Sequence, residues 1–331
     1  MLSTKKIIVV FAIIFTLINT GSNAQENLSA EEGEIKTSTE LEFQLSTEPG
    51  AKAILTQSFI FPVFQGTNPL VSGNNLKTSL IADLTPVSFN GAASLTLTPI
   101  AFLELAGGAK AGSGWKINLF GGDIHGVGVN TPIGTRNPGD PPRYSEIIGE
   151  ALGGVIWSYW AGGALQFDLA AIFPGDWNHV LFRTYHEARY SAYTEAKNGE
   201  SWIFESDFAE NRNGWTYNAS YVLAYQMPLS PYMNLVGIMA ELKQNLYNVP
   251  NKSYWGDDIG YWILSALLNF SITPEFNTTV AVQFHTVRNF GSTDLENKRS
   301  IYYQDRKLLS NQGESRAVLY RLALLMNYKI R

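Results

Sequence analysis

A period of two residues, repeated from about Thr39 onward, is the feature that most limits how this chain can fold. It is clearest from Trp215 to Met227, where apolar and aromatic residues alternate with small and polar ones. Because successive side chains of a β-strand point to opposite faces, this segment has one apolar face and one mainly polar face. The pattern predicts an all-β protein built from amphipathic strands.

The same alternation recurs along the rest of the chain. Its segments have about the length that crosses a membrane at a tilt, roughly 9–11 residues. We expect strands at Thr39–Thr47, Ala51–Val63, Leu76–Thr85, Ala93–Ala106, Ser145–Trp160, Ala164–Phe173, His179–Thr194, Ser201–Ala209, Trp215–Met227, Val236–Lys243, Trp262–Thr273, Thr279–His285 and Tyr320–Ile330.

The last of these segments ends the chain. Its apolar face consists of Tyr320, Leu322, Leu324, Met326, Tyr328 and Ile330, and on its other face only Leu325 interrupts the alternation. This segment resembles the C-terminal strand of bacterial outer-membrane β-barrels, which the barrel assembly machinery recognises. Those strands usually end in an aromatic residue, whereas this one ends in Arg331. The resemblance implies outer-membrane lipid and the assembly machinery as partners.

The resemblance also implies the fold, a transmembrane antiparallel up-and-down β-barrel of the porin-like class over residues 37–331. Bacterial single-chain barrels have even strand numbers, so we predict 12 strands. Fourteen is the alternative, with Trp115–Phe120 as a candidate for an additional strand. The run Gly112-Ser113-Gly114-Trp115 resembles a Gly-rich motif followed by Trp in uncharacterised spirochaete outer-membrane proteins.

Turns and loops follow a second pattern. Short segments rich in turn-forming residues separate some strands: Glu48-Pro49-Gly50, Phe89-Asn90-Gly91, Met227–Pro231 and Thr273-Pro274-Glu275. Longer polar segments separate others: Phe64–Asn75, Gly107–Tyr144, Asn248–Gly260 and Gly291–Ser315. Outer-membrane barrels have short periplasmic turns and long extracellular loops, so we expect the two kinds of segment at opposite ends.

The N-terminus carries an export signal. Lys5 and Lys6 precede the apolar run Ile7–Ile18, and the small residues Ser22 and Ala24 suit cleavage after Ala24. The run is shorter than the ~20 residues of a membrane-spanning helix. We predict a signal peptide at 1–24 and an acidic, mobile lead-in at 25–36. The mature chain is then secreted to the periplasm and located in the outer membrane of a Gram-negative-type envelope.

Composition agrees with a surface that faces lipid. Charged residues are 16% of the chain, against about 25% in soluble domains. Aromatic residues reach 13%, and Tyr and Trp concentrate at membrane interfaces. The chain has no cysteine and a net charge of -5. We therefore expect no disulfide, no thiolate metal site and no nucleic-acid partner.

Charged residues inside two predicted strands are the candidate functional residues. They are Arg183, Tyr185, Glu187 and Arg189 on one face of a strand, and Glu241 and Lys243 on another. A charge facing lipid is costly, so these side chains should point into the barrel. Two interpretations are open: they form a constriction that contacts solutes, or a salt-bridge network that fills a narrow barrel.

Other polar residues give weaker signals. The segment Gly121–Tyr144 is either a mobile surface loop or a loop folded into the barrel, and the spacing of Asp123 and Asp140 matches no calcium loop. None of the four histidines lies in a catalytic motif, and His186 and Ser191 should face opposite sides of their strand. We therefore expect no enzyme, no metal site and no cofactor.

The sequence favours a channel for passive passage of small solutes, since a 12-strand barrel with a polar interior can enclose water. Large inward residues such as Ile263 and Leu267 favour a filled barrel, whereas Gly237, Ser220 and Ala281 favour an open one. A plugged barrel that binds partners through its loops is therefore an alternative. A further alternative is an enzyme with a site at the rim. A soluble β-sandwich is disfavoured because strands facing water should carry more charge.

Overall fold

The structure is a computed structural model that describes residues 34–47, 50–119, 122–134, 143–197, 200–205, 211–227, 232–246, 260–288, 290–292, 306–308 and 315–330. The predicted signal peptide and most of the lead-in lie outside the described residues, as do much of the predicted loops 248–260 and 291–315. In the described part of the chain, no helix has the length and apolarity needed to span a membrane.

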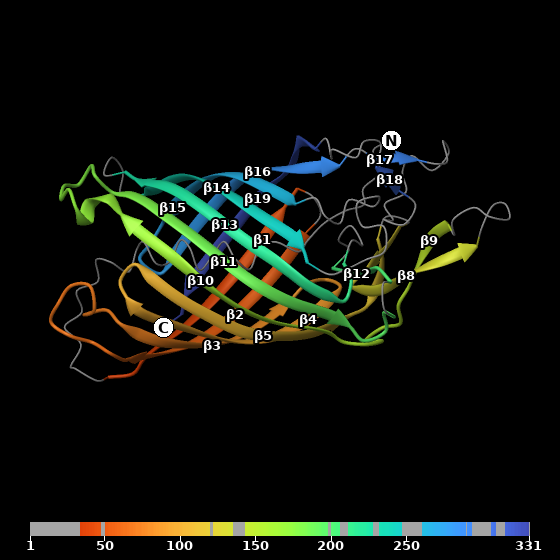
Figure 1. The fold of residues 1–331 in the computed structure, drawn as a ribbon, viewed down its shortest axis with the longest axis horizontal. Helices are drawn as coiled ribbons and strands as arrows, with labels where there is room; N and C mark the ends of the chain where they lie inside the picture. The colour runs from red at the N-terminus through yellow and green to blue at the C-terminus, as the bar shows by residue number, and fades with distance from the viewer. Residues whose placement is uncertain are drawn as a thin grey trace.

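Antiparallel strands close into a 12-strand barrel, as predicted (Figure 1). Each strand pairs with its neighbours along the chain, and β1 pairs with β19 to close the cylinder. The barrel strands are β1 (Lys36–Ser46), β2 (Gly50–Pro62), β3 (Asn75–Leu84), β4 (Ser88–Ile100), β5 (Leu103–Gly114), β10 (Ile156–Asp168), β11 (Val180–Tyr193), β13 (Gly214–Gln226), β14 (Met233–Asn245), β15 (Tyr261–Ser271), β16 (Phe276–Arg288) and β19 (Ser315–Lys329).

The outer wall of the barrel is apolar. Along β15, residues 263, 265, 267 and 269 are buried inside, whereas residues 264, 266 and 268 are exposed outside. The other strands repeat this alternation and expose large apolar side chains, among them Phe43, Leu55, Leu80, Leu95, Leu105, Tyr159, Leu165, Phe182, Trp215, Leu223, Ile238, Leu264, Phe284 and Leu322. A continuous apolar outer wall is the surface that a transmembrane barrel presents to lipid.

The two ends of the barrel differ. At the end opposite Lys329, which we call the long-loop end, lie the segments 115–155, 194–213, 246–260 and 289–314. Figure 1 shows the short strands β8 (Val127–Gly134), β9 (Arg143–Ile148), β12 (Trp202–Phe204), β17 (Phe290–Ser292) and β18 (Arg306–Leu308) at this end, on the right of the view. A sixth and seventh short strand, β6 (Lys116–Leu119) and β7 (Gly122–His125), form a hairpin.

The separation of short turns from long loops is only partly as expected. The segment between β2 and β3, predicted as an extracellular loop at Phe64–Asn75, lies at the end of the barrel where β19 ends. The turn at 48–50 instead lies at the long-loop end. The segment between β2 and β3 is compact and is closed by backbone hydrogen bonds of Val71 and Asn74. The length of a connection therefore does not by itself indicate at which end of the barrel it lies.

Strand boundaries required three corrections between residues 85 and 114. The predicted strand Ala93–Ala106 is two strands, β4 and β5, separated by the turn at Ala101 and Phe102. Phe89-Asn90-Gly91 is no turn, because the chain reverses at Thr85–Val87, where the Thr85 amide donates to Ser88 O over 2.9 Å. Residues from Gly107 to Gly114 belong to strand β5 and not to a loop. The sequence pattern did not indicate a strand here because most of these side chains are small and conceal the alternation.

Two more corrections lie between residues 145 and 209. The predicted strands Ser145–Trp160 and Ala164–Phe173 are replaced in the barrel by β10 alone, which continues through Gly162 and Gly163 and ends at the 3-10 turn η2 (Leu169–Ala171). The predicted strand Ser201–Ala209 is not a barrel strand, because only Trp202–Phe204 forms a strand and it pairs with β8. One strand gained and two lost take the 13 predicted segments to the 12 strands of the barrel.

A β-bulge changes the facing of one residue in β19. Gln283 pairs with Arg321, but Phe284 pairs with Leu319, so Tyr320 is the additional residue. A bulge moves the preceding residues to the opposite face. Tyr320, predicted on the apolar outer face, is therefore buried inside and stacks on His285, with ring centroids 4.5 Å apart.

Candidate functional site

The interior of the barrel has two unlike sides. On β14, β15, β16 and β19, the inward residues Met239, Leu267, Ala281, Ala323 and Leu325 form a buried apolar cluster. At the middle of β4 and β5 the inward residues Ala92, Ser94, Thr96 and Ala106 are small and remain partly accessible, as does Thr56 on β2, where the neighbouring inward residues are the larger Ile54 and the buried Ser58. The described interior is thus filled along one side and lined by small side chains along the other.

Three of the predicted site residues, Tyr185, Glu187 and Arg189, form one network on the inward face of β11, and Arg183 lies on the same face. Glu187 is its centre: its carboxylate accepts hydrogen bonds from Tyr185 Oη (2.8 Å), Arg189 Nε (2.7 Å) and Asn218 Nδ2 (3.1 Å). Arg183 pairs with Glu104 on β5. The geometry brings Arg183, Tyr185, Glu187 and Arg189 together as an inward stripe with alternating charge.

Local packing holds this network in place. The Arg189 guanidinium lies over the Trp160 ring, 4.3 Å from its centroid, which is a cation–π contact. Gly162 lies opposite Glu187 in the register of β10 and β11. A Cβ on Gly162 would come within 2.8 Å of the Glu187 Cβ, so only glycine leaves room for the carboxylate here.

Glu241 and Lys243 lie further around the wall, on β14. The register places Lys243 opposite Asn218, which in turn contacts Glu187. Glu241 lies opposite Ser220 and is buried. Lys243 Nζ donates to Asn211 Oδ1 over 3.4 Å, so it meets the segment between β11 and β13. The six predicted residues therefore occupy adjacent parts of one side of the interior.

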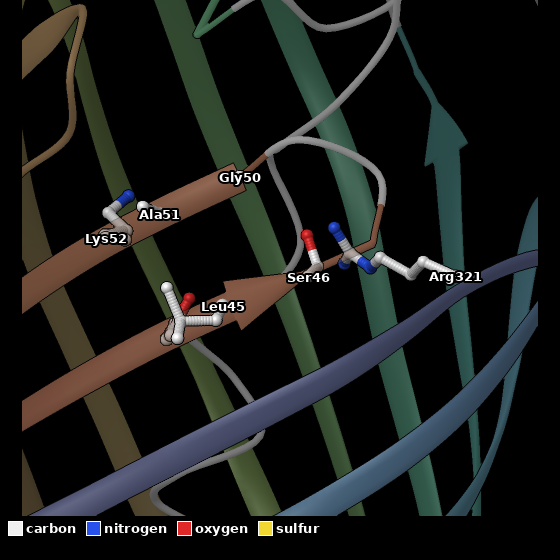
Figure 2. A pocket seen from close by; sticks show the side chains of 7 residues that line it. Leu45, Ser46, Gly50, Ala51, Lys52 and Arg321 are labelled. Atoms are coloured by element: carbon white, nitrogen blue, oxygen red, sulfur yellow. The ribbon is translucent and has the colours of Figure 1, made fainter. Parts of the chain in front are cut away.

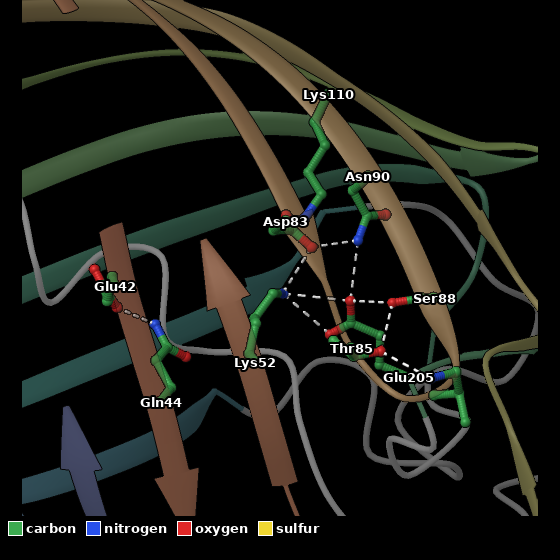
Figure 3. A network of polar contacts seen from close by, with 10 residues as sticks. Glu42, Gln44, Lys52, Asp83, Thr85, Ser88, Asn90, Lys110 and Glu205 are labelled. Atoms are coloured by element: carbon green, nitrogen blue, oxygen red, sulfur yellow. Dashed lines mark hydrogen bonds and ion pairs between the residues drawn. The ribbon is translucent and has the colours of Figure 1, made fainter. Parts of the chain in front are cut away.

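A second polar network, absent from the predicted site, lies near the long-loop end on β2, β3, β4 and β5 (Figure 3). Asp83 accepts from Lys52 (3.2 Å), Lys110 (2.8 Å) and Asn90 (2.5 Å). Thr85 and Ser88 hydroxyls lie 2.9 Å apart beside them. These side chains come from inward positions of four consecutive strands, which explains their convergence.

The centre of this second network is Glu205, which does not belong to the barrel wall. It lies in the segment 194–213 between β11 and β13, which we call the mouth loop. Its carboxylate contacts Ser88, Asn90 and Lys52. Two barrel strands, β10 and β5, lie between β11 and β4, so Glu205 joins the mouth loop to a part of the wall that is not adjacent to the strands the loop connects.

An apolar cluster supports the mouth loop. Trp202 and Ala196 pack with Tyr193, Ile156 and Val127, all of them buried. Strand β12 pairs with β8, and β8 pairs with β9. The segment predicted either as a surface loop or as a loop folded into the barrel, Gly121–Tyr144, thus contributes β8 to this support, while residues 135–142 lie outside the described residues.

At the seam where the barrel closes, Arg321 organises a third polar group. Arg321 Nε donates to Gln283 Oε1 over 2.7 Å, and Gln283 Nε2 donates to Ser265 Oγ over 2.8 Å. A small pocket at this seam is lined by Gln44, Leu45, Ser46, Gly50, Ala51, Lys52 and Arg321. Figure 2 shows the Arg321 side chain extending toward Ser46 at the end of β1.

The positions of the histidine and acidic side chains are relevant to metal binding and to catalysis. Among the residues that the structure describes, no group of three His, Asp or Glu side chains is placed to hold a metal ion. His186 is on the outward face of β11, where its ring nitrogens contact Thr184 Oγ1 (2.7 Å) and Tyr217 Oη (2.6 Å). Ser191 is at an odd-numbered, inward position of the same strand.

Comparison with known proteins gives similarity to barrels of low sequence identity. No protein-family model matches the sequence, and no curated protein matches it. A KdgM porin is 11% identical with a TM-score of 0.34, over 89% of this chain and 99% of that chain. A loop-deletion mutant of OmpT, an outer membrane protein of Vibrio cholerae, is 6% identical with a TM-score of 0.29, over 90% and 100%.

The architecture itself defines the class. Twelve antiparallel strands close on themselves, and the wall is apolar outside and carries paired charges inside. The chain has the fold of an outer-membrane β-barrel.

Proposed function

We propose that this protein is a channel for passive passage of small solutes across the outer membrane. One observation carries the proposal: at the middle of β4 and β5 the inward side chains of Ala92, Ser94, Thr96 and Ala106 are small and stay partly accessible within a closed barrel. A filled barrel of this size would place bulky side chains at such positions. The proposed role involves no catalysis.

The charged stripe on β11 gives the proposed path its chemical character. Glu104, Arg183, Glu187 and Arg189 alternate in sign, and the Arg189 side chain is one-quarter exposed, whereas Glu187 is almost fully buried. Fixed charges along a channel wall influence which ions pass. The exposed guanidinium of Arg189 therefore favours contact with anionic groups of passing solutes.

A plugged barrel is the second candidate function. The observation that favours it is the mouth loop, which Glu205 fastens to β2 and β4 at the long-loop end. In that case the long loops would bind partners outside the cell.

We also propose that β19 is recognised by the barrel assembly machinery during insertion, through the apolar face that ends at Ile330.

Single-channel conductance in a planar lipid bilayer separates the two candidates. Discrete openings from refolded wild-type protein support a channel. The variant Lys243→Glu should then shift the reversal potential toward cation preference, because it makes the wall more negative, whereas Lys243→Arg should leave it unchanged. Silence from inserted wild-type protein, and equally from Glu205→Ala, would reject the channel and leave the plugged barrel.

A further inference from the structure

Three hydrogen-bond donors of the barrel wall converge on the Glu205 carboxylate. Ser88 Oγ donates to Oε1 over 2.7 Å, Asn90 Nδ2 to the same oxygen over 3.1 Å, and Lys52 Nζ lies 3.3 Å from both oxygens (Figure 3). Ser88 and Asn90 are at most 1% exposed. An ammonium group with neutral donors around one carboxylate is the arrangement by which proteins bind carboxylates.

The wall holds these donors in position independently of Glu205. Asp83 fixes both Lys52 and Asn90, and Thr85 contacts the Ser88 hydroxyl. These partners belong to β3 and the turn after it, so they stay in place if the mouth loop moves. The donor set is thus a preorganised site, and it does not depend on the loop for its shape.

Charge favours an anion at this position. Without Glu205, the wall network contains two cations, Lys52 and Lys110, against one anion, Asp83. Glu205 brings the second negative charge and balances the group. An anion of similar size could take the same place with the same balance of charge.

The carboxylate that occupies the site comes from a loop attached elsewhere. The backbone of Glu205 is in the left-handed region, with φ at 50°, which a residue with a side chain adopts at a cost. Its amide donates to Gly126 O over 2.7 Å, and the adjoining β12 pairs with β8 over three residues. The apolar cluster around Trp202 keeps β12 attached, so the restraint that a competing anion would remove is the contact of the Glu205 side chain with the wall.

We infer that Lys52, Ser88 and Asn90 form a carboxylate-binding site on the wall, and that Glu205 is its intramolecular occupant. A solute that carries a carboxylate competes with Glu205 for the site and releases the mouth loop from β2 and β4. The release of the loop as a step in passage rests on the proposed channel. The binding site itself does not.

Binding of succinate, measured by isothermal titration calorimetry on detergent-folded protein, tests the site without reference to passage. A tethered carboxylate competes at an effective concentration on the order of millimolar, so Glu205→Ala should bind succinate at least tenfold more tightly than wild type. Adding Lys52→Met to Glu205→Ala should abolish this gain. Glu195→Ala, an exposed carboxylate of the same loop, is the matched control and should bind as wild type does.

Two outcomes would overturn the inference: equal binding by wild type and Glu205→Ala, or a gain in binding that survives Lys52→Met. Succinamide, the neutral analogue, should not bind any variant. If Glu205→Ala does not fold, as judged by circular dichroism, Glu205→Gln keeps the size of the side chain without its charge, and it should also bind succinate more tightly than wild type.

Conductance then tests the release step. If wild-type protein conducts, succinate should increase the fraction of time in the open state, and Glu205→Ala should show that increase without succinate. A conducting protein whose gating is the same in wild type and Glu205→Ala would overturn release. Protein that binds succinate as expected but never conducts would reject the channel and leave the site intact.

Discussion

Replacement of Glu187 by alanine tests whether the β11 stripe is a structural network or a set of separately hydrated charges. The carboxylate accepts from Tyr185, Arg189 and Asn218, and its side chain is 1% exposed. Its removal leaves three donors without their acceptor. Breaking a buried ion pair costs roughly 3–5 kcal/mol, and a hydrogen bond to a charged group contributes about 1.5–3 kcal/mol.

The structure places the expected cost at the lower end of that range. The Arg189 side chain is 25% exposed and stacks on Trp160, so water and the indole ring still stabilise its charge after the substitution. We expect Glu187→Ala to lower the free energy of unfolding by roughly 3 kcal/mol. Glu187→Gln, which keeps one acceptor oxygen, should cost about 2 kcal/mol.

Urea unfolding of the protein in lipid vesicles, followed by tryptophan fluorescence, measures these changes. Glu195→Ala is the control, because an exposed carboxylate should contribute within about 0.5 kcal/mol. A double-mutant cycle between Glu187→Gln and Arg189→Met isolates the coupling of the pair. A cost below about 1 kcal/mol for Glu187→Ala would refute the network, since it would show that the carboxylate is hydrated in the wild type.

Three other substitutions test the outer wall, the mouth network and the mouth loop. Ile238→Arg puts a charge on an outward position that is 61% exposed, and it should lower the free energy of unfolding in vesicles by roughly 2–4 kcal/mol. Ile238→Leu should leave this free energy unchanged, and equal effects of the two substitutions would contradict a lipid-facing wall. Gly112→Ala places a Cβ 1.8 Å from Asn90 Oδ1, so it should displace the Asn90 amide and lower the free energy of unfolding in urea by about 1–3 kcal/mol. The Cβ added by Gly91→Ala meets no atom within 4 Å, so this control should leave the free energy of unfolding unchanged. Trp202→Ala should speed cleavage of the mouth loop by added protease without changing the unfolding midpoint of the barrel, because the barrel residues in its cluster, Ile156 and Tyr193, are the terminal residues of their strands. A lowered midpoint would show that loop and barrel unfold together.

Strands with large side chains were predictable from the sequence. Trp215–Met227 alternates between mostly bulky outward residues and mostly small or polar inward ones, and Trp262–Thr273 does so apart from the inward Ile263 and Leu267. The two segments correspond to strands β13 and β15 within two residues. The strength of the signal comes from the contrast between lipid and interior. The fold class followed from such segments, whereas the strand number of 12 came from the rule that bacterial barrels have even strand numbers.

Strands β5 and β10 were harder to recognise for the opposite reason. Residues Gly107 to Ala111 place glycine and alanine on both faces, and β10 contains the pair Gly162 and Gly163. Glycine suggests a turn in a sequence, yet in this barrel some glycines lie where neighbouring side chains approach closely. Alternation disappears at such positions because neither side chain is large enough to display it.

The mouth network was missed because it depends on contacts between distant segments. Asn90 was assigned to a turn and Glu205 to a barrel strand, whereas one belongs to β4 and the other follows β12. Their contact joins residues 115 positions apart. Inward facing of Lys52, Asp83 and Lys110 could have been derived from strand periodicity, but the contact of the mouth loop with the wall could not.

The interior has one side that holds the barrel together and another that would line the proposed channel. Between β14 and β19, Leu267, Ala281 and Leu325 are buried at 2% exposure or less, so their packing stabilises the closed cylinder at its seam. Across from them, small side chains such as Ser94 and Ala106 make few contacts and leave space. The charged stripe on β11 and the mouth network border that space at two heights, and Glu205 reaches into it from a loop. Substitutions on the packed side should therefore act on stability, and those on the open side on passage.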